Sequence, residues 1–342
     1  MRDVQRRLLD LGHRIDPSEL SGSFGPSTED AVRQFQRARS LPVDGIVGSD
    51  TWGLLVESGY RLGDRTLYLR SPAFRGDDVR ELQRMLNALG FDAGKQDGIF
   101  GRNTAEAVRE FQRNVADRVD GIVGLDAVRT LERMRPAVDG PSRAVVREEE
   151  AVRAMTTSLP GSTVAIDPGH GERDPDDEQR ILEADLTFAL AAELARSIEE
   201  RGATPVMLRS PGEDPTPSDR AQTANGLGAA VCVSLSLRVS DPHRRGASCA
   251  YWGTATTHSP AGRRLAELIV TELVGAGLPD GGTRPLAVTL LRETAMPAVI
   301  VEPGRVSDPD EGFLLSDPVF RRRIADAIAE GVARFLRGPV PA

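Results

Sequence analysis

The chain contains the same stretch of sequence twice, and this duplication constrains its fold more than any other feature. Residues 24–55 read FGPSTEDAVRQFQRARSLPVDGIVGSDTWGLL, and residues 100–131 read FGRNTAEAVREFQRNVADRVDGIVGLDAVRTL. A shorter match, QRRLLDLG against QRMLNALG, precedes the two stretches. A repeat of this kind is one structural unit used twice. We therefore expect two copies of one small domain, over residues 1–62 and 63–135.

Each copy is predicted to be helical. Ala31, Val32 and Phe35 recur at i, i+1 and i+4, which is the spacing of a core-facing helical stripe, and the second copy repeats the pattern. Thr28 and Thr104 lie where these helices should begin. The turn sequence VDGIVG follows each helix and precedes a further short helix. Three short helices around a tight turn are the expected all-α fold of each copy.

Both copies resemble the peptidoglycan-binding repeat of bacterial and phage cell-wall hydrolases, whose signature joins AVxxFQ to VDGxVG. The resemblance implies binding of glycan or stem peptide in a groove beside the turn, which makes Asp44 and Asp120 candidate ligand-binding residues. The sequence equally allows these two residues to serve only in building the turn. In this region the first copy reads LSGS at 20–23 and the second copy reads DGIF at 97–100, so the first copy departs further from the signature.

The second half of the chain alternates strand-like and helix-like segments. Strands are predicted at 163–167, 203–209, 230–237, 247–252, 286–292 and 298–302, and helices at about 183–201, 217–226, 259–276 and 318–336. This alternation predicts an α/β domain over residues 161–342, with a mostly parallel sheet flanked by helices. Residues 136–160 combine Pro, Gly and charged residues and are interpreted as a linker.

Candidate catalytic residues lie near the ends of the predicted strands. The first strand runs directly into Asp-Pro-Gly-His-Gly, which places the imidazole of His170 at a strand terminus where it can bind a metal. Glu183 lies at the start of the next predicted helix and could bring a carboxylate to the same edge of the sheet.

The motifs over residues 160–337 resemble, in order, those of the zinc-dependent N-acetylmuramoyl-L-alanine amidases of the amidase-3 type: VAIDPGHGE, a Glu before a helix, LR, RxxxxN, VSLSLRV and PAVIVEPGRVSD. The resemblance implies that His170 and Glu183 bind zinc and that Glu302 acts as general base on a zinc-bound water. It also carries over three candidate substrate-binding residues, Arg209, Arg220 and Asn225.

One position departs from that pattern at the metal itself. The family's third zinc ligand is a histidine, and Ser236 stands in its place. A neutral hydroxyl is a weak zinc donor, so the predicted zinc site is weakened. His243, in the following loop, could substitute, or it could be an ordinary solvated histidine, and His258 is a weaker candidate. Arg305 is a second departure, which either fills the site or lies at the surface.

Two functions from different classes are therefore open. The architecture resembles the actinobacterial CwlM-like proteins, which implies a regulator of peptidoglycan precursor synthesis that acts through a protein partner, the first committed enzyme of the pathway. The alternative is an active zinc amidase that cleaves the bond between N-acetylmuramic acid and L-alanine. Ser236 favours the regulator, whereas the survival of His170, Glu183 and Glu302 favours the enzyme.

Charge and composition exclude other classes. The chain has 43 basic and 51 acidic residues, a net charge of −8, and residues 136–342 carry all of it. This acidity argues against a nucleic-acid partner. No apolar run approaches the roughly 18 residues of a membrane span, and the N-terminus MRDVQRR lacks the apolar stretch of a signal peptide. The expected location is the cytoplasm, or outside the cell if the start codon is misplaced. Cys232 and Cys249 are expected to be buried thiols.

Overall fold

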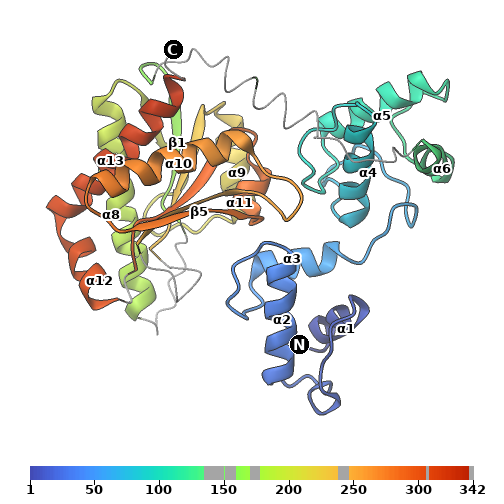
Figure 1. Ribbon diagram of the computed structural model, residues 1–342, viewed down its shortest axis with the longest axis horizontal. Coiled ribbons are helices and arrows are strands. Elements are labelled where there is room, and N and C mark those ends of the chain that lie inside the picture. Colours follow the sequence, from blue (N-terminus) through green and yellow to red (C-terminus); the bar gives the residue numbers. More distant parts are fainter. Residues whose placement is uncertain (135–149, 151–158, 170–177, 238–245, 306–307, 339–342) are drawn as a thin grey trace. The chain divides into compact units, whose positions relative to one another are not determined.

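The chain divides into two compact units, Met1–Glu150 and Ala151–Ala342. The structure, a computed structural model, describes residues 1–134, 150, 159–169, 178–237, 246–305 and 308–338 (Figure 1). Most of the predicted linker, residues 136–160, lies outside the described residues.

The first unit contains two modules of three short α-helices each, which confirms the predicted all-α fold. The first module has α1 (Arg2–Asp10), α2 (Pro26–Ala38) and α3 (Ser49–Glu57), with a short 3₁₀ helix, η1 (Pro17–Glu19). The second has α4 (Asp77–Ala88), α5 (Arg102–Asn114) and α6 (Leu125–Arg133). The apolar stripe of the sequence forms each core, because Phe35 and its counterpart Phe111 are almost completely buried.

The second unit contains a six-stranded sheet in the order β2-β1-β3-β6-β4-β5. Its strands are β1 (Thr163–Asp167), β2 (Thr204–Met207), β3 (Val231–Leu235), β4 (Ala247–Trp252), β5 (Asp280–Leu286) and β6 (Ala298–Glu302). The first four strands of that order are parallel to one another, whereas β4 pairs antiparallel with β6 and parallel with β5. The mostly parallel α/β fold predicted from the sequence is therefore confirmed.

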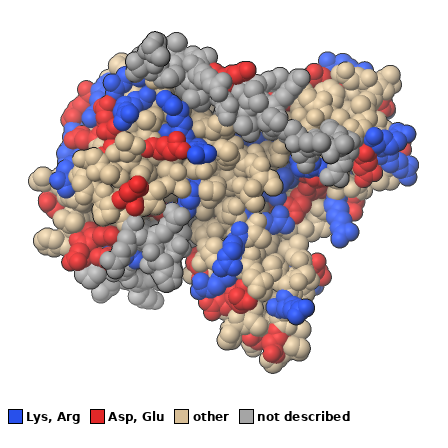
Figure 2. Space-filling view, viewed as in Figure 1, with Lys and Arg blue, Asp and Glu red and all other residues tan. Residues whose placement is uncertain are grey.

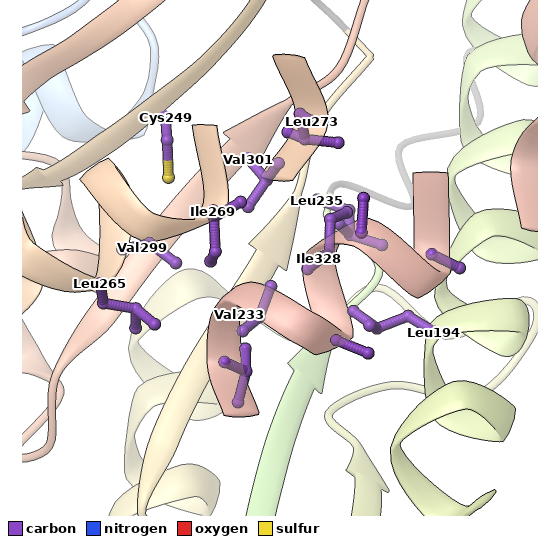
Figure 3. Packing of buried hydrophobic residues seen from close by; sticks show 14 of the residues in the cluster. Leu194, Val233, Leu235, Cys249, Leu265, Ile269, Leu273, Val299, Val301 and Ile328 are labelled. Atoms are coloured by element: carbon purple, nitrogen blue, oxygen red, sulfur yellow. The ribbon is translucent and has the colours of Figure 1, made fainter. Parts of the chain in front are cut away.

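Helices cover both faces of this sheet (Figure 1). They are α8 (Glu178–Glu200), α9 (Pro217–Gly226), α10 (Pro260–Gly275), α11 (Thr289–Glu293), α12 (Pro309–Ser316) and α13 (Pro318–Leu336). Side chains from α8, α10 and α13 interlock with alternate residues of the strands, and Figure 3 shows this core around Val233, Val301 and Ile269. The neighbouring strand residues point to the opposite face, the one covered by α9 and α11.

Two predicted elements differ from the structure. The segment 286–292 was expected to be a strand, but β5 covers Asp280–Leu286 and most of the rest belongs to helix α11. Short apolar runs such as VTLLR do not distinguish strand from helix by their periodicity. The true strand contains two glycines and Pro285, which an edge strand such as β5 tolerates. Helix α8 also begins at Glu178, five residues before the predicted start at 183.

Candidate functional site

The order of the strands identifies the edge of the sheet where a site is expected. The chain leaves β1 through α8 to reach β2 on one side, then returns through α9 to β3 on the other side. Where the strand order reverses in this way, a crevice opens at the carboxyl ends of the two central strands, and ligands commonly bind there. Pro168 and Gly169 follow β1, and Ser236 follows β3, at this edge.

A buried ion pair fixes the end of β1. One carboxylate oxygen of Asp167 accepts a hydrogen bond from Arg220 Nη1 of α9 at 2.7 Å, and both side chains are at most 3% exposed. The other oxygen accepts a hydrogen bond from Ser234 Oγ of the neighbouring strand at 2.6 Å. A buried charge requires such pairing and hydrogen bonding, so these three residues define the end of β1 and the start of the turn that follows.

Two buried arginines hold that turn through its main chain. Arg220 Nη1 and Arg209 Nε donate to the carbonyl oxygen of Gly169, at 2.8 and 3.2 Å, and Arg209 Nη2 donates to the carbonyl of Pro168 at 3.3 Å. Gly169 has φ +69°, and a Cβ there would lie 2.4 Å from the carbonyl oxygen of Leu235. The turn that leads to His170 is therefore tightly packed, although His170 itself lies outside the described residues.

The three residues predicted to bind substrate all make structural contacts in this unit. Arg209 and Arg220 are buried and bond the main chain of the turn. Asn225 connects α9 to the end of α11, donating to the carbonyl of Glu293 at 2.9 Å and accepting from the N–H of Ala295 at 2.7 Å. A role in substrate binding stays a prediction for all three residues.

Glu302, the predicted general base, is held in a buried ion pair. Arg284 of β5 binds both of its carboxylate oxygens, with Nη2–Oε1 at 2.8 Å and Nη1–Oε2 at 2.7 Å. Ser248 Oγ of β4 donates to Oε2 at 2.8 Å. These residues come together because β4 runs antiparallel to β6, which places Ser248 directly opposite Glu302. Only 3% of the Glu302 side chain is exposed.

Of the predicted metal-ligand positions, the structure describes Ser236 and Glu183, and both lie at this edge of the sheet. Ser236 follows β3 and is half-buried, and its N–H donates to the carbonyl of Val301 at 3.0 Å. Glu183 is half-buried in the second turn of α8. His170 and His243 lie outside the described residues. Within the described ranges, no group of three or more His, Cys, Asp and Glu side chains is placed to hold a metal ion.

The structure also describes two further residues that the sequence singled out, His258 and Arg305. His258 pairs with Gly253, just after β4, and its ring lies 6.0 Å from that of Tyr251. Because β4 is antiparallel to β6, this end of β4 is at the opposite edge of the sheet from Glu302, so His258 does not replace the missing ligand. Arg305 folds back onto its own loop, where its Nη2 lies 3.3 Å from an oxygen of Asp308.

The module residues Asp44 and Asp120 build the turns in which they lie. Asp120 accepts hydrogen bonds from Ile122 N–H and Gln112 Nε2, both at 2.9 Å, and these bonds lower the pKa of its carboxyl group. Asp44 bonds Ile46 and Gln36 in the same way, at 2.8 and 2.7 Å. A third such turn lies at Asp97, which accepts hydrogen bonds from Gln83 Nε2 and Ile99 N–H, both at 2.8 Å, and the DGI sequence that all three turns share is its signal. Ligand binding by Asp44 and Asp120 stays a prediction.

The two cysteines are buried thiols, as expected. Cys232 and Cys249 are free and buried, and burial raises the pKa of both thiols. Basic and acidic side chains are interspersed over the face shown in Figure 2. Among the helices that the structure describes, none is long and apolar enough to cross a membrane.

Comparisons with known proteins agree with the fold. The N-acetylmuramoyl-L-alanine amidase family matches residues 164–334, and the peptidoglycan binding domain family matches residues 1–55 and 75–131. N-acetylmuramoyl-L-alanine amidase CwlM of Mycobacterium tuberculosis is 38% identical, with 98% of this chain and 83% of that protein covered. LytC of Bacillus subtilis, also named an N-acetylmuramoyl-L-alanine amidase, is 27% identical, and the match covers 52% of this chain and 36% of LytC.

A solved structure, the N-acetylmuramoyl-L-alanine amidase of Clostridium difficile 630, is 28% identical, with a TM-score of 0.47, and covers 52% of this chain and 97% of that one. The family match spans the whole α/β sheet, and the relative from M. tuberculosis spans almost the whole chain. The chain therefore belongs to the N-acetylmuramoyl-L-alanine amidase family of the amidase-3 type and carries two peptidoglycan binding domains at its N-terminus.

Proposed function

We propose that this chain is a peptidoglycan-related protein that keeps the amidase fold but has lost amidase catalysis, and that it regulates peptidoglycan precursor synthesis through a protein partner. The observation that carries the proposal is Ser236 at the position of the family's third zinc ligand, at the same edge of the sheet as Glu302. The partner that the resemblance to CwlM-like proteins implies is the first committed enzyme of precursor synthesis. Such a role requires the cytoplasm as the location of both proteins.

The donor set does not fit a catalytic zinc ion. Such sites use three protein ligands and keep one position for water. Here the position of the third ligand offers a hydroxyl, which is neutral and binds zinc weakly. The lost imidazole was itself a ligand, so the loss of affinity should exceed the 10–100-fold that follows from mutating an outer-shell partner.

The contacts of Glu302 support the same proposal. A general base needs an oxygen directed at the proton that it removes. Both oxygens of Glu302 accept hydrogen bonds from Arg284, and one also accepts a bond from Ser248. These contacts give Glu302 a structural role inside the sheet.

An active amidase is the second candidate, and one observation favours it. The main chain of Pro168 and Gly169, which precede His170 in the sequence, keeps the buried support of Arg209 and Arg220, and a decayed site has no need for it. In this case Glu183 and His170 would hold the zinc ion with His243 or solvent, and the ion would polarise the amide carbonyl.

The experiment that separates the two candidates uses the purified full chain in two assays. The first measures turnover by the first committed enzyme of precursor synthesis with and without this protein. The second measures release of stem peptides from purified peptidoglycan, with Glu302→Ala as the control. We expect a change in turnover and no peptide release. Release that is lost in Glu302→Ala, together with unchanged turnover, would establish the enzyme instead.

A further inference from the structure

The segment that joins the two modules, residues 58–76, differs from the rest of the chain in charge and composition. It contains four arginines and one aspartate, a net charge of 4 − 1 = +3 in a chain of net charge −8. It also contains two of the three tyrosines of the chain, Tyr60 and Tyr68. This composition is unusual for the chain, because the rest of the protein is acidic and poor in aromatic residues.

The segment is part of the folded second module. Leu67 is completely buried and forms a two-way hydrogen-bonded bridge with Val123, at 3.1 and 2.8 Å. Phe74 is 8% exposed, and its carbonyl accepts a hydrogen bond from Phe100 N–H at 2.9 Å. The segment is therefore anchored to the second module at Leu67 and at Phe74.

Arginine and aromatic side chains stack around Phe74. Arg65 binds both oxygens of Asp78, at 2.7 and 3.0 Å, and its guanidinium lies 3.7 Å from the centre of the Tyr60 ring and 5.0 Å from that of Phe74. The Tyr68 ring meets Phe74 edge-on at 5.3 Å, and the Arg70 guanidinium lies 3.8 Å from the centre of the Phe74 ring. These contacts order the exposed rings.

The outer side of this stack is open to solvent. Tyr60 is 40% exposed, Tyr68 41% and Leu69 44%, and Arg61 and Arg70 are also exposed. In the part of the chain that the structure describes, no carboxylate lies within ion-pairing distance of Arg61 or Arg70. We call these five residues the Tyr68 patch.

We propose that the Tyr68 patch is a docking surface for an acidic segment of a protein partner. This proposal rests on the proposed function, in which the chain acts through a protein partner. Tyrosine and arginine are enriched among the few residues that carry most of the binding energy in protein interfaces. Because the rings of Tyr60 and Tyr68 are already ordered, little conformational entropy is lost when a partner covers them. The free guanidinium groups complement carboxylates and repel basic proteins.

The test uses the full chain and a labelled copolymer of glutamate and tyrosine as the probe, followed by fluorescence anisotropy. Tyr68→Ser/Arg70→Ser removes one ring and one cation from the patch. The matched control, Arg7→Ser/Trp52→Ser, removes the same pair from the first module, where Arg7 lies 5.4 Å from the Trp52 ring and Trp52 is 39% exposed. If the double variant does not fold, the single variant Arg70→Glu is used instead, because it keeps both rings of the patch and reverses one charge.

We expect the wild-type protein to bind the copolymer, with an affinity that falls as salt rises from about 0.05 to about 0.5 M. The patch variants should lose about tenfold or more in affinity, whereas the control should change by less than about twofold. Three results would overturn the proposal: no binding by the wild-type protein, equal loss in the patch and control variants, or complete displacement of the copolymer by inorganic pyrophosphate, which would indicate a phosphate site.

A second titration, with the first committed enzyme of precursor synthesis in place of the copolymer, separates the proposed function from the proposed docking surface. If that enzyme does not bind the wild-type chain, the proposed function fails for this partner, and the copolymer result still decides the chemistry of the patch. If the enzyme binds the wild-type chain and the patch variants equally well, the partner docks elsewhere and the Tyr68 patch is refuted as the docking surface.

Discussion

Replacing Arg284 with methionine should destabilise the second unit strongly. Methionine keeps the aliphatic bulk but removes the guanidinium that binds both oxygens of Glu302 at 2.7 and 2.8 Å. The Glu302 side chain is only 3% exposed, so its carboxylate would remain buried without this guanidinium. Removing one partner of such a pair costs about 3–5 kcal/mol. At about 2–4 °C per kcal/mol for a domain of this size, the melting temperature should fall by about 6–20 °C.

The second variant, Glu302→Gln, separates loss of charge pairing from loss of packing. In Arg284→Met/Glu302→Gln no charge is left buried, so the double variant should recover about 1–3 kcal/mol relative to the sum of the single variants. Tryptophan fluorescence in a Trp52→Phe background reports on the second unit alone, because Trp252 is then the only tryptophan. A loss below about 0.5 kcal/mol for Arg284→Met, or strict additivity of the two changes, would refute the reasoning.

Three further predictions concern backbone and turn positions. Gly169→Ala should lower the free energy of unfolding by more than about 1–2 kcal/mol, because it combines a left-handed backbone with a Cβ 2.4 Å from a carbonyl oxygen. The control Gly226→Ala in α9, where the space around the residue is open, should leave the melting temperature unchanged or slightly higher. Gln112→Leu leaves the buried N–H of Gly121 unpaired and should cost the second module about 1–3 kcal/mol in urea unfolding, whereas exposed Gln34→Leu should change little. Glu19 has its pKa lowered to about 2, because hydrogen bonds from Thr28 and Ser27 outweigh the effect of desolvation, so its stabilisation is complete above the usual value of 4.5 and is lost as pH falls toward 2. The stability difference between the wild-type protein and Glu19→Leu should shrink over that pH range, and a constant difference would contradict this account.

Much of the fold could be predicted because its signals are local. The repeat at 24–55 and 100–131 contains its own helical stripe and turn, so one interpretation applies to both modules. The strands with continuous apolar sequence, such as AVIVE at β6, are buried on both faces and are recognisable for that reason. Edge strand β5 was missed because its glycines and Pro285 resemble a turn.

The contacts of the candidate site could not be predicted from the sequence in the same way. Arg284 lies on the strand that was missed, and it reaches Glu302 across β4, so the pairing depends on strand order as well as on residue type. Similarly, the roles of Arg209 and Arg220 follow from their hydrogen bonds to the carbonyl of Gly169, a contact that no spacing in the sequence specifies. Ser236 was visible in the sequence because the family pattern fixes its position.

The most direct measurement for the central claim is the zinc content of the purified chain by elemental analysis after equilibration with zinc, made in parallel on the wild-type protein and Ser236→His. Because a hydroxyl replaces the third ligand, we expect well below one zinc ion per wild-type chain and a content near one in Ser236→His. One zinc ion per wild-type chain, together with release of stem peptides from peptidoglycan that Glu302→Ala abolishes, would contradict the account.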